Sequence, residues 1–263
     1  MTTLTYAVGD SATMLRRNLR HMQRYPSLAL MLIGMPVVFL LLFVYVLGGT
    51  MGAGLDGVTG GRTQYLAYVV PGILMIAVAA VAQGTAISVA MDMTEGIIDR
   101  FRTMAISRAA VLTGHVVGAM IQTLGCLAIV LGVAVAIGFR PTAGPLQWLG
   151  AIGMLALIAL ALTWLTVALG LRARSVETAS NSPMPLLLLP FFGSGFVPSK
   201  TMPAGLRWFA AHQPFTPMIE TVRGLLMGTH IGHSAITAVA WCTAIGAFGY
   251  LRARYAYDRR AAR

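Results

Sequence analysis

The alternation of apolar and charged segments along the chain predicts several membrane-spanning helices. Six long runs contain no Asp, Glu, Lys or Arg, and they occupy residues 25–55, 63–91, 109–139, 141–171, 178–199 and 224–251. A helix needs about 20 apolar residues to cross the ~30 Å hydrocarbon layer of a bilayer, so each run has room for one crossing. We therefore predict a single all-α membrane domain over residues 1–263 with six transmembrane helices, at about 27–47, 65–90, 110–137, 148–170, 183–198 and 233–252.

Composition supports this fold class and excludes others. Of the 263 residues, 57% are hydrophobic and only 10% are charged, against about 25% charged in soluble domains. A soluble enzyme, a nucleic-acid-binding protein and a secreted disulfide scaffold are excluded. Cys126 and Cys242 both fall within predicted spans, where a free buried thiol is the expected state.

The positive charges predict the orientation of the spans. The net charge is +11, and in a membrane protein the excess of Lys and Arg marks the cytoplasmic side. Fourteen arginines precede the first span, follow the last, or lie between spans two and three or four and five, whereas the other side carries five cations: Arg62, Arg140, Lys200, Arg207 and Arg223. We expect a multi-pass protein of the cell membrane with both termini, including the tail over 253–263, in the cytoplasm.

The segment before the first span, within residues 1–26, has the pattern of an amphipathic helix. At 100° per residue an apolar side formed by Ala12, Leu15, Leu19 and Met22 opposes four arginines, Arg16, Arg17, Arg20 and Arg24. This pattern predicts a helix that lies in the cytoplasmic interface and faces lipid phosphates or an acidic partner. A solvated basic leader is the alternative.

A second amphipathic segment, residues 92–108, joins spans two and three. Helical projection places Ile97, Ile98, Phe101, Met104 and Ala105 on one side and Glu95, Asp99 and Arg102 on the other. An apolar face on such a short helix must dock on the membrane surface or on a partner protein. An ordinary interfacial loop helix is the less favoured interpretation.

Three further regions have unusual patterns. Residues 48–64 are rich in glycine and are expected to form an outer loop, and the fifth span carries four prolines that should kink it: Pro183, Pro185, Pro190 and Pro198. Residues 199–233 predict outer re-entrant helices, one of which starts at Thr216-Pro217 and stops at Gly228. Glu220 and Arg223 are expected to pair at i, i+3 on that helix, with a structural role favoured over substrate binding.

The sequence offers no sign of catalysis, a metal site or a cofactor. The segment Gly193 to Thr201 resembles a nucleotide loop, but serines replace its glycines and Pro198 removes an amide donor. His230 and His233 have no Cys or carboxylate near them to complete a metal site. The predicted spans also lack the ionisable residues that ion-driven carriers use, so energy for any transport should enter from outside the membrane.

Several motifs at matching positions in this frame resemble those of the type-2 ABC exporter permeases, and most closely those of the daunorubicin/doxorubicin-resistance permeases. They are Glu95-Gly96-Ile97-Ile98-Asp99-Arg100-Phe101 with Ile106-Ser107-Arg108, Phe192-Gly193-Ser194-Gly195-Phe196-Val197-Pro198 with Met202-Pro203, and His212-Gln213-Pro214-Phe215-Thr216-Pro217 with Arg223-Gly224-Leu225. The resemblance covers nearly the whole chain.

The resemblance implies a permease subunit that is not itself an enzyme. ATP and Mg would bind a separate ABC nucleotide-binding subunit, and a second permease copy, identical or a sister chain, would complete the transporter. The family's coupling helix falls on residues 92–104, where contacts to the nucleotide-binding subunit would involve Glu95, Gly96, Ile97, Asp99, Arg100, Phe101 and Arg102. Its interfacial helix falls on residues 10–24, and its outer re-entrant helices on residues 199–228.

The expected function is ATP-driven export of a hydrophobic or amphipathic drug, such as an antibiotic. The substrate path would lie at the interface of the two permeases, lined by spans one, two and five, although no individual contact residue is identified. Export of a lipid or a lipid-linked glycan is the alternative, and a membrane scaffold without transport is a third possibility. The expected partners are membrane lipid, the two protein subunits and a small hydrophobic substrate, with no nucleic acid.

Overall fold

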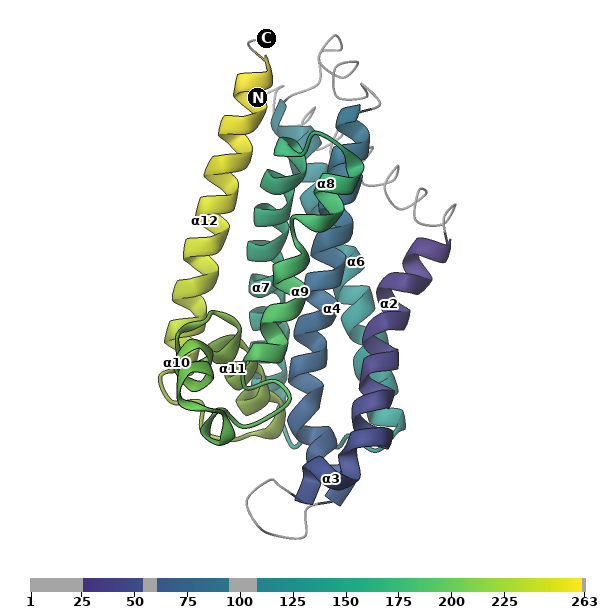
Figure 1. Cartoon of the computed structure of the whole chain (residues 1–263), viewed down its shortest axis with the longest axis vertical. Helices are drawn as coiled ribbons and strands as arrows, with labels where there is room; N and C mark the ends of the chain where they lie inside the picture. Colours follow the sequence, from purple (N-terminus) through teal and green to yellow (C-terminus); the bar gives the residue numbers. More distant parts are fainter. Residues whose placement is uncertain (1–25, 54–60, 95–107, 262–263) are drawn as a thin grey trace.

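The computed structural model describes residues 26–53, 61–94 and 108–261, and this part of the chain is built from helices (Figure 1). Five of them are long and apolar enough to cross a membrane, namely Leu32–Thr50, Gly61–Thr94, Thr113–Ala136, Pro145–Arg172 and Ser234–Ala256. The expected all-α membrane architecture is therefore confirmed.

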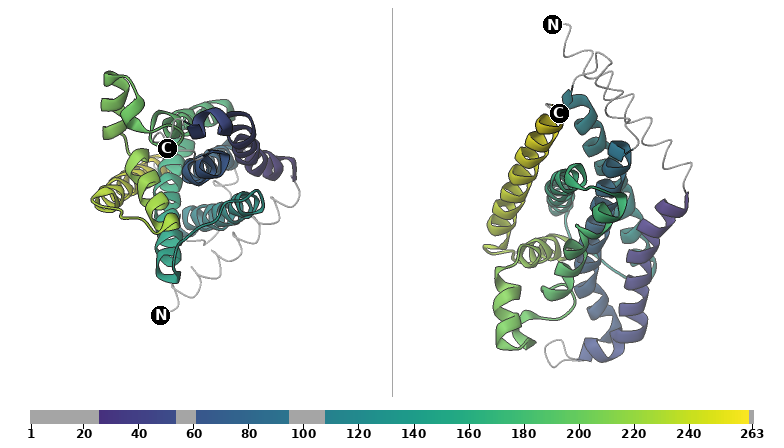
Figure 2. Two further views of the ribbon diagram at one scale, coloured as in Figure 1. Left: turned by 90° about the horizontal axis from the view of Figure 1, so that it is seen from below. Right: turned by 45° about the horizontal axis from the view of Figure 1, so that its top comes forward.

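The long helices form an upright bundle. The first consists of α2 (Pro26–Leu41), a π-helical turn η1 (Leu42–Leu47) and α3 (Gly48–Ala53). The others are α4 (Gly61–Thr94), α6 (Arg108–Ala136), α7 (Pro145–Arg172) and α12 (Ser234–Ala261). Figures 1 and 2 place α2 and α12 on opposite flanks, with α4 and α7 between them.

Helix α4 is the centre of the bundle. Within its most apolar window 89% of the residues are buried, against 22% in the first helix and 17% in α12. Small residues bring its neighbours close, since a Cβ on Gly170 of α7 would lie 2.6 Å from the Ala86 carbonyl oxygen of α4. Helices in membranes associate largely through such close contacts, so α4 and α7 form the fixed part of the fold.

The predicted fifth span is not one continuous helix. Residues 176–192 form three short pieces, α8 (Val176–Asn181), α9 (Met184–Leu188) and the 3₁₀ turn η2 (Leu189–Phe192), and a turn over 193–198 follows. Pro183, Pro185 and Pro190 lack the amide hydrogen that a helix interior needs, which explains the breaks. Figure 1 shows these pieces running down the length of the bundle, and we call residues 176–198 the broken crossing.

Beyond the broken crossing, η3 (Ser199–Thr201), α10 (Ala204–His212) and α11 (Phe215–Met227) gather at one end of the bundle. Helix α11 starts one residue before the predicted Thr216 and stops where predicted, because Gly228 takes the left-handed conformation (φ +64°) that often ends a helix. Its predicted apolar residues Met218, Ile219 and Val222 are fully buried. We call this the α11 end and the opposite one the α8 end.

The glycine-rich region after the first span differs from the loop that was expected over 48–64. Residues 48–53 continue as helix α3, and α4 already begins at Gly61. A Cβ on Gly48 would lie 3.3 Å from the Cγ atom of Arg62, so close packing of α3 on α4 offsets the low helix propensity of glycine. The prediction of a loop is wrong for these residues.

Candidate functional site

The predicted functional residues divide between described and undescribed parts of the chain. The coupling residues Glu95, Gly96, Ile97, Asp99, Arg100, Phe101 and Arg102 lie outside the described residues, as do the interfacial Arg16, Arg17, Arg20 and Arg24. Glu220 and Arg223 both lie on α11. Because the coupling and interfacial residues lie outside the described part, the candidate site is the region where α4, α11 and the broken crossing meet. We call this region the joint.

Side chains of α4 donate hydrogen bonds to backbone carbonyls of the broken crossing at two positions along the bundle. The Gln83 Nε2 atom donates to the Ser180 carbonyl at 2.7 Å, and the Tyr65 hydroxyl donates to the Phe196 carbonyl at 3.3 Å. A broken helix leaves carbonyls without helical partners, and such groups are tolerated at membrane depth only when protein groups satisfy them. Helix α4 thus provides side-chain partners for two carbonyls of the broken crossing.

The backbones of α4 and the broken crossing also touch directly. A Cβ on Gly72 would lie 2.8 Å from the Gly195 carbonyl oxygen, and a Cβ on Gly195 would lie 3.3 Å from the Gly72 Cα atom. Gly72 follows Pro71, the proline inside α4. Any side chain at either glycine would force the turn over 193–198 away from α4.

An aromatic cluster covers the joint on the side of the first helix. The ring of Phe196 stacks on Phe191 at 4.8 Å between centroids and lies 4.4 Å from the ring of Phe43, which belongs to the π-helical turn η1. Phe39 of α2 meets Phe191 edge to face at 5.7 Å. Aromatic pairs in this range contribute about 0.5–1.5 kcal/mol beyond their buried area, so the cluster ties the first helix to the broken crossing.

Arg223 of α11 contacts both α4 and the turn over 193–198. Its Nη2 atom donates to the Ser194 carbonyl at 2.6 Å and to the Tyr68 carbonyl at 3.2 Å, and its Nε atom also donates to the Tyr68 carbonyl at 3.3 Å. The guanidinium carbon lies 3.8 Å from the centre of the Tyr68 ring, a cation–π contact. Burial lowers the pKa of Arg223, and Tyr68 and Glu220 oppose that shift. One side chain thus connects α11, α4 and the turn over 193–198.

Glu220 and Arg223 do not pair with each other as expected, and each side chain has a different partner. Glu220 Oε2 accepts a 3.0 Å hydrogen bond from the Ser234 hydroxyl at the start of α12, whereas Arg223 turns toward α4. Glu220 acts on Arg223 only through its longer-range charge. The spacing i, i+3 permits an ion pair on an isolated helix, but two neighbouring carbonyls and an aromatic ring compete successfully for the guanidinium.

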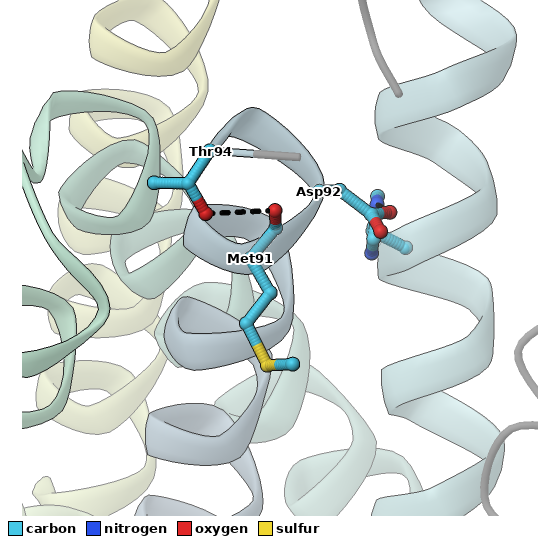
Figure 3. A network of polar contacts seen from close by, with 4 residues as sticks. Met91, Asp92 and Thr94 are labelled. Carbon is cyan, nitrogen blue, oxygen red and sulfur yellow. Dashed lines mark hydrogen bonds and ion pairs between the residues drawn. The ribbon is translucent and has the colours of Figure 1, made fainter. Parts of the chain in front are cut away.

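At the α8 end, α4 and α6 are joined by a contact between a histidine and a carboxylate. The His115 Nε2 atom lies 3.1 Å from Asp92 Oδ2, and both side chains are largely buried. Figure 3 shows the Asp92 side chain leaving α4 on the side opposite Thr94, whose hydroxyl donates to the Met91 carbonyl at 3.0 Å. Asp92 and His115 stand just before and after the predicted coupling residues, so this pair fixes the two helices between which that segment runs.

Sequence reasoning missed Tyr65, Tyr68, Gln83 and the Asp92–His115 pair as connecting groups. A usable signal was present for Gln83, because an amide in the middle of an apolar span usually has a partner. The four prolines also indicated that nearby side chains must satisfy free carbonyls. Nothing in the sequence indicated which helix would provide them.

Comparison with known proteins gives consistent similarities. The model of the ABC-2 type transporter family matches residues 11–227. The chain is 29% identical over 224 residues to the daunorubicin resistance ABC transporter permease protein DrrB1 of Streptomyces coeruleorubidus, covering 85% of this chain and 77% of that protein. It is 26% identical over 224 residues to the probable doxorubicin resistance ABC transporter permease protein DrrC of Mycobacterium tuberculosis, covering 82% and 80%. These similarities confirm the resemblance that the motifs indicated.

Proposed function

The chain belongs to the ABC-2 type transporter family, and we propose that it is the permease subunit of an ATP-driven exporter of a hydrophobic or amphipathic drug. The observation that carries the proposal is the family match over 11–227 together with relatives named for daunorubicin and doxorubicin resistance. The five long apolar helices agree with a multi-pass membrane permease.

The broken crossing is the sixth passage through the membrane in this proposal. It descends from the α8 end to the α11 end (Figure 1), and the described chain starts and finishes toward the α8 end. Arg172, Arg174 and Arg252, three of the fourteen arginines predicted to be cytoplasmic, lie toward that end. The proposed orientation therefore has the α8 end and both termini in the cytoplasm and the α11 end outside.

ATP hydrolysis takes place on a separate nucleotide-binding subunit in this proposal, and this chain binds no cofactor. The segment over 95–102 docks on that subunit, with Glu95, Asp99, Arg100 and Arg102 as its polar contacts. Helix α4 leads directly from that segment to the joint with the broken crossing. A push on the coupling segment would thus reach the α11 end through the most buried helix of the bundle.

A second permease copy completes the transporter, and the substrate passes between the two copies along the first helix, α4 and the broken crossing. Support comes from the low burial of the first helix, which exposes Met35, Val38 and Leu42 on its surface, and from the exposed Leu188 and Phe192 on the broken crossing. An apolar surface of this kind suits lipid, a second copy or a hydrophobic substrate.

Substitutions in the coupling segment test the proposed link to ATP. We expect Glu95→Ala or Gly96→Pro to leave the protein in the membrane while ATP hydrolysis continues without export, because each alters the docking helix and not the bundle. Drug transport and ATPase activity should be measured on the same vesicles. Wild-type transport rates in both variants would refute the assignment of this segment.

Purification of the tagged chain in mild detergent from its native host tests the proposed function as a whole. A nucleotide-binding subunit should co-elute stoichiometrically, identified by mass, and the complex should hydrolyse ATP with stimulation by doxorubicin. Stimulation only by lipid-linked glycans would favour glycan export instead. A chain that elutes alone and inactive would favour a scaffold.

A further inference from the structure

The turn over 193–198 fits into a narrow slot between α4 and α11. A Cβ on Gly193 would collide with the Gln213 Nε2 atom, just before α11, while Gly195 faces Gly72 of α4. Glycines thus form both contact surfaces of the turn, and no side chain of the turn interlocks with its neighbours at these two points. At these two points the turn can separate from its neighbours without a change of side-chain rotamers, so that Phe196, which packs on Phe43 and Phe191, is the side chain of the turn that must move.

Arg223 is the charged group that bridges this slot. It binds the Ser194 carbonyl on the turn and the Tyr68 carbonyl on α4 at the same time. Both partners are backbone carbonyls and neither is a carboxylate, so water can replace Arg223 on the turn without leaving a charge unpaired. The contact with the Tyr68 ring holds the guanidinium on α4 whether or not the turn is bound.

The Ser194 side chain gives a second, independent indication. Its hydroxyl is buried, with 3% of the residue exposed, and has no hydrogen-bond partner within the described part of the chain. Buried polar groups in native proteins are nearly always paired, and an exception calls for an explanation. A hydroxyl that meets water in another state of the molecule explains why a serine stands at this sealed position.

We propose that Arg223 is a positioning residue for export, which holds the turn over 193–198 on α4 in the closed state and releases the Ser194 carbonyl when the path opens at the α11 end. The proposal rests on the proposed function, because it assumes a transport cycle. Its direct consequence, that Arg223 keeps Ser194 sealed, is independent of the substrate.

The test uses the complex of this chain with its nucleotide-binding subunit in lipid nanodiscs. In a background where Cys126 and Cys242 are replaced by serine, Ser194→Cys places a thiol at the buried position, and a hydrophilic maleimide measures its access to water. Arg223→Gln and Arg223→Lys are compared with Arg207→Gln. Arg207 is a matched control because it also donates to a carbonyl, but that of Met202, just before its own helix α10, and not one on another helix.

Without ATP, we expect Arg223→Gln to raise the labelling rate at least fivefold over Arg207→Gln, with Arg223→Lys between them. With ATP, labelling of the Arg207→Gln complex should rise, whereas the Arg223→Gln complex should change little because its turn is already released. Export by Arg223→Gln should lose maximal rate with little change in KM, since the substrate-binding surface is intact.

Equal ATP-free labelling of Arg223→Gln and Arg207→Gln would overturn the proposal. If Arg223→Gln does not reach the membrane, Arg223→Lys and Tyr68→Leu decide the question, and labelling at the control rate in both would equally overturn it. Failure of the proposed function gives a different result, namely no ATPase activity and no transport in the parent complex while the ATP-free difference persists.

Discussion

The two ends of α4 hold their neighbours by different means. At the α11 end, the Tyr68 carbonyl of α4 accepts from Arg223 of α11 and the Gly72 backbone packs on the turn over 193–198. The Tyr65 hydroxyl of α4 adds one hydrogen bond to the turn. At the α8 end the Asp92 carboxylate of α4 meets His115 of α6. Carbonyl contacts can be exchanged for water with little loss, whereas breaking the Asp92–His115 contact removes a partner from a largely buried carboxylate. We therefore expect α4 and α6 to move together at the α8 end, whereas the turn over 193–198 can separate from α4 at the α11 end.

Close packing differs between the ends as well. Near the α8 end, Gly170 of α7 lies against the continuous backbone of α4 at Ala86, while near the α11 end Gly72 lies against the turn over 193–198. Neither α4 nor α7 can move aside without distorting a long helix, but a turn can. Equivalent substitutions at the two glycines should thus have unequal effects on stability and on transport.

Gly170→Ala should give the largest loss of stability. The new Cβ would lie 2.6 Å from the Ala86 carbonyl oxygen, and overpacking between two fixed helices costs roughly 3 kcal/mol. The thermal unfolding midpoint of the purified protein measures the effect. Gly132→Ala on α6 is the control, because a Cβ there meets nothing within 4 Å. Equal midpoints for the two variants would contradict the packing of α4 on α7.

Gly72→Ala should reduce the free energy of unfolding less, by about 2 kcal/mol, but should impair export more. The Cβ would push against Gly195 and displace the turn, which weakens the contact between Arg223 and Ser194. Transport rate and unfolding midpoint should be compared with those of Gly170→Ala. A variant that loses stability and keeps full export would show that the turn has no part in transport.

The Asp92–His115 pair should contribute about 1–2 kcal/mol of coupling between α4 and α6. A double-mutant cycle with Asp92→Asn and His115→Gln measures this energy from the unfolding midpoints of the two single variants and the double variant. We expect the double variant to be more stable than the sum of the single effects predicts. Strict additivity would show that the pair does not join the helices.

Tyr65→Phe should have the smallest effect, a loss of about 1 kcal/mol from the hydrogen bond to the Phe196 carbonyl. The comparison is Tyr250→Phe, which removes a hydroxyl from an exposed ring that packs edge to face on Trp164. A larger shift of the unfolding midpoint for Tyr65→Phe would support the role of α4 in pairing the carbonyls of the broken crossing. The reverse order would count against it.

The charge pattern predicted the long helices because a charge-free run of sufficient length has few other stable structures in a bilayer. The predicted stop of α11 at Gly228 also agrees with the structure, since few residues adopt the left-handed conformation. The prolines were expected to kink the fifth span, and the structure goes further by dividing it into three short pieces, whereas the loop predicted over 48–64 was wrong for residues 48–53. Prolines broke a helix that hydrophobicity favoured, and packing on α4 kept glycines helical.

The candidate site was harder to predict because it depends on partners far apart in the sequence. Arg223 was placed correctly on the helix that stops at Gly228, but its partner was sought within that helix when it lies 155 residues away in α4. Local spacing cannot reveal a contact of this kind. The coupling residues Glu95 to Arg102 stay a prediction.

The most direct test of the whole account is doxorubicin uptake by inside-out membrane vesicles that contain this chain and its nucleotide-binding subunit. We predict accumulation that requires ATP, stops when the Walker lysine of the ATPase subunit is replaced, and is absent from vesicles with the ATPase subunit alone. Equal uptake with and without this chain, in the presence of an active ATPase subunit, would contradict the assignment of the chain as the permease of a drug exporter.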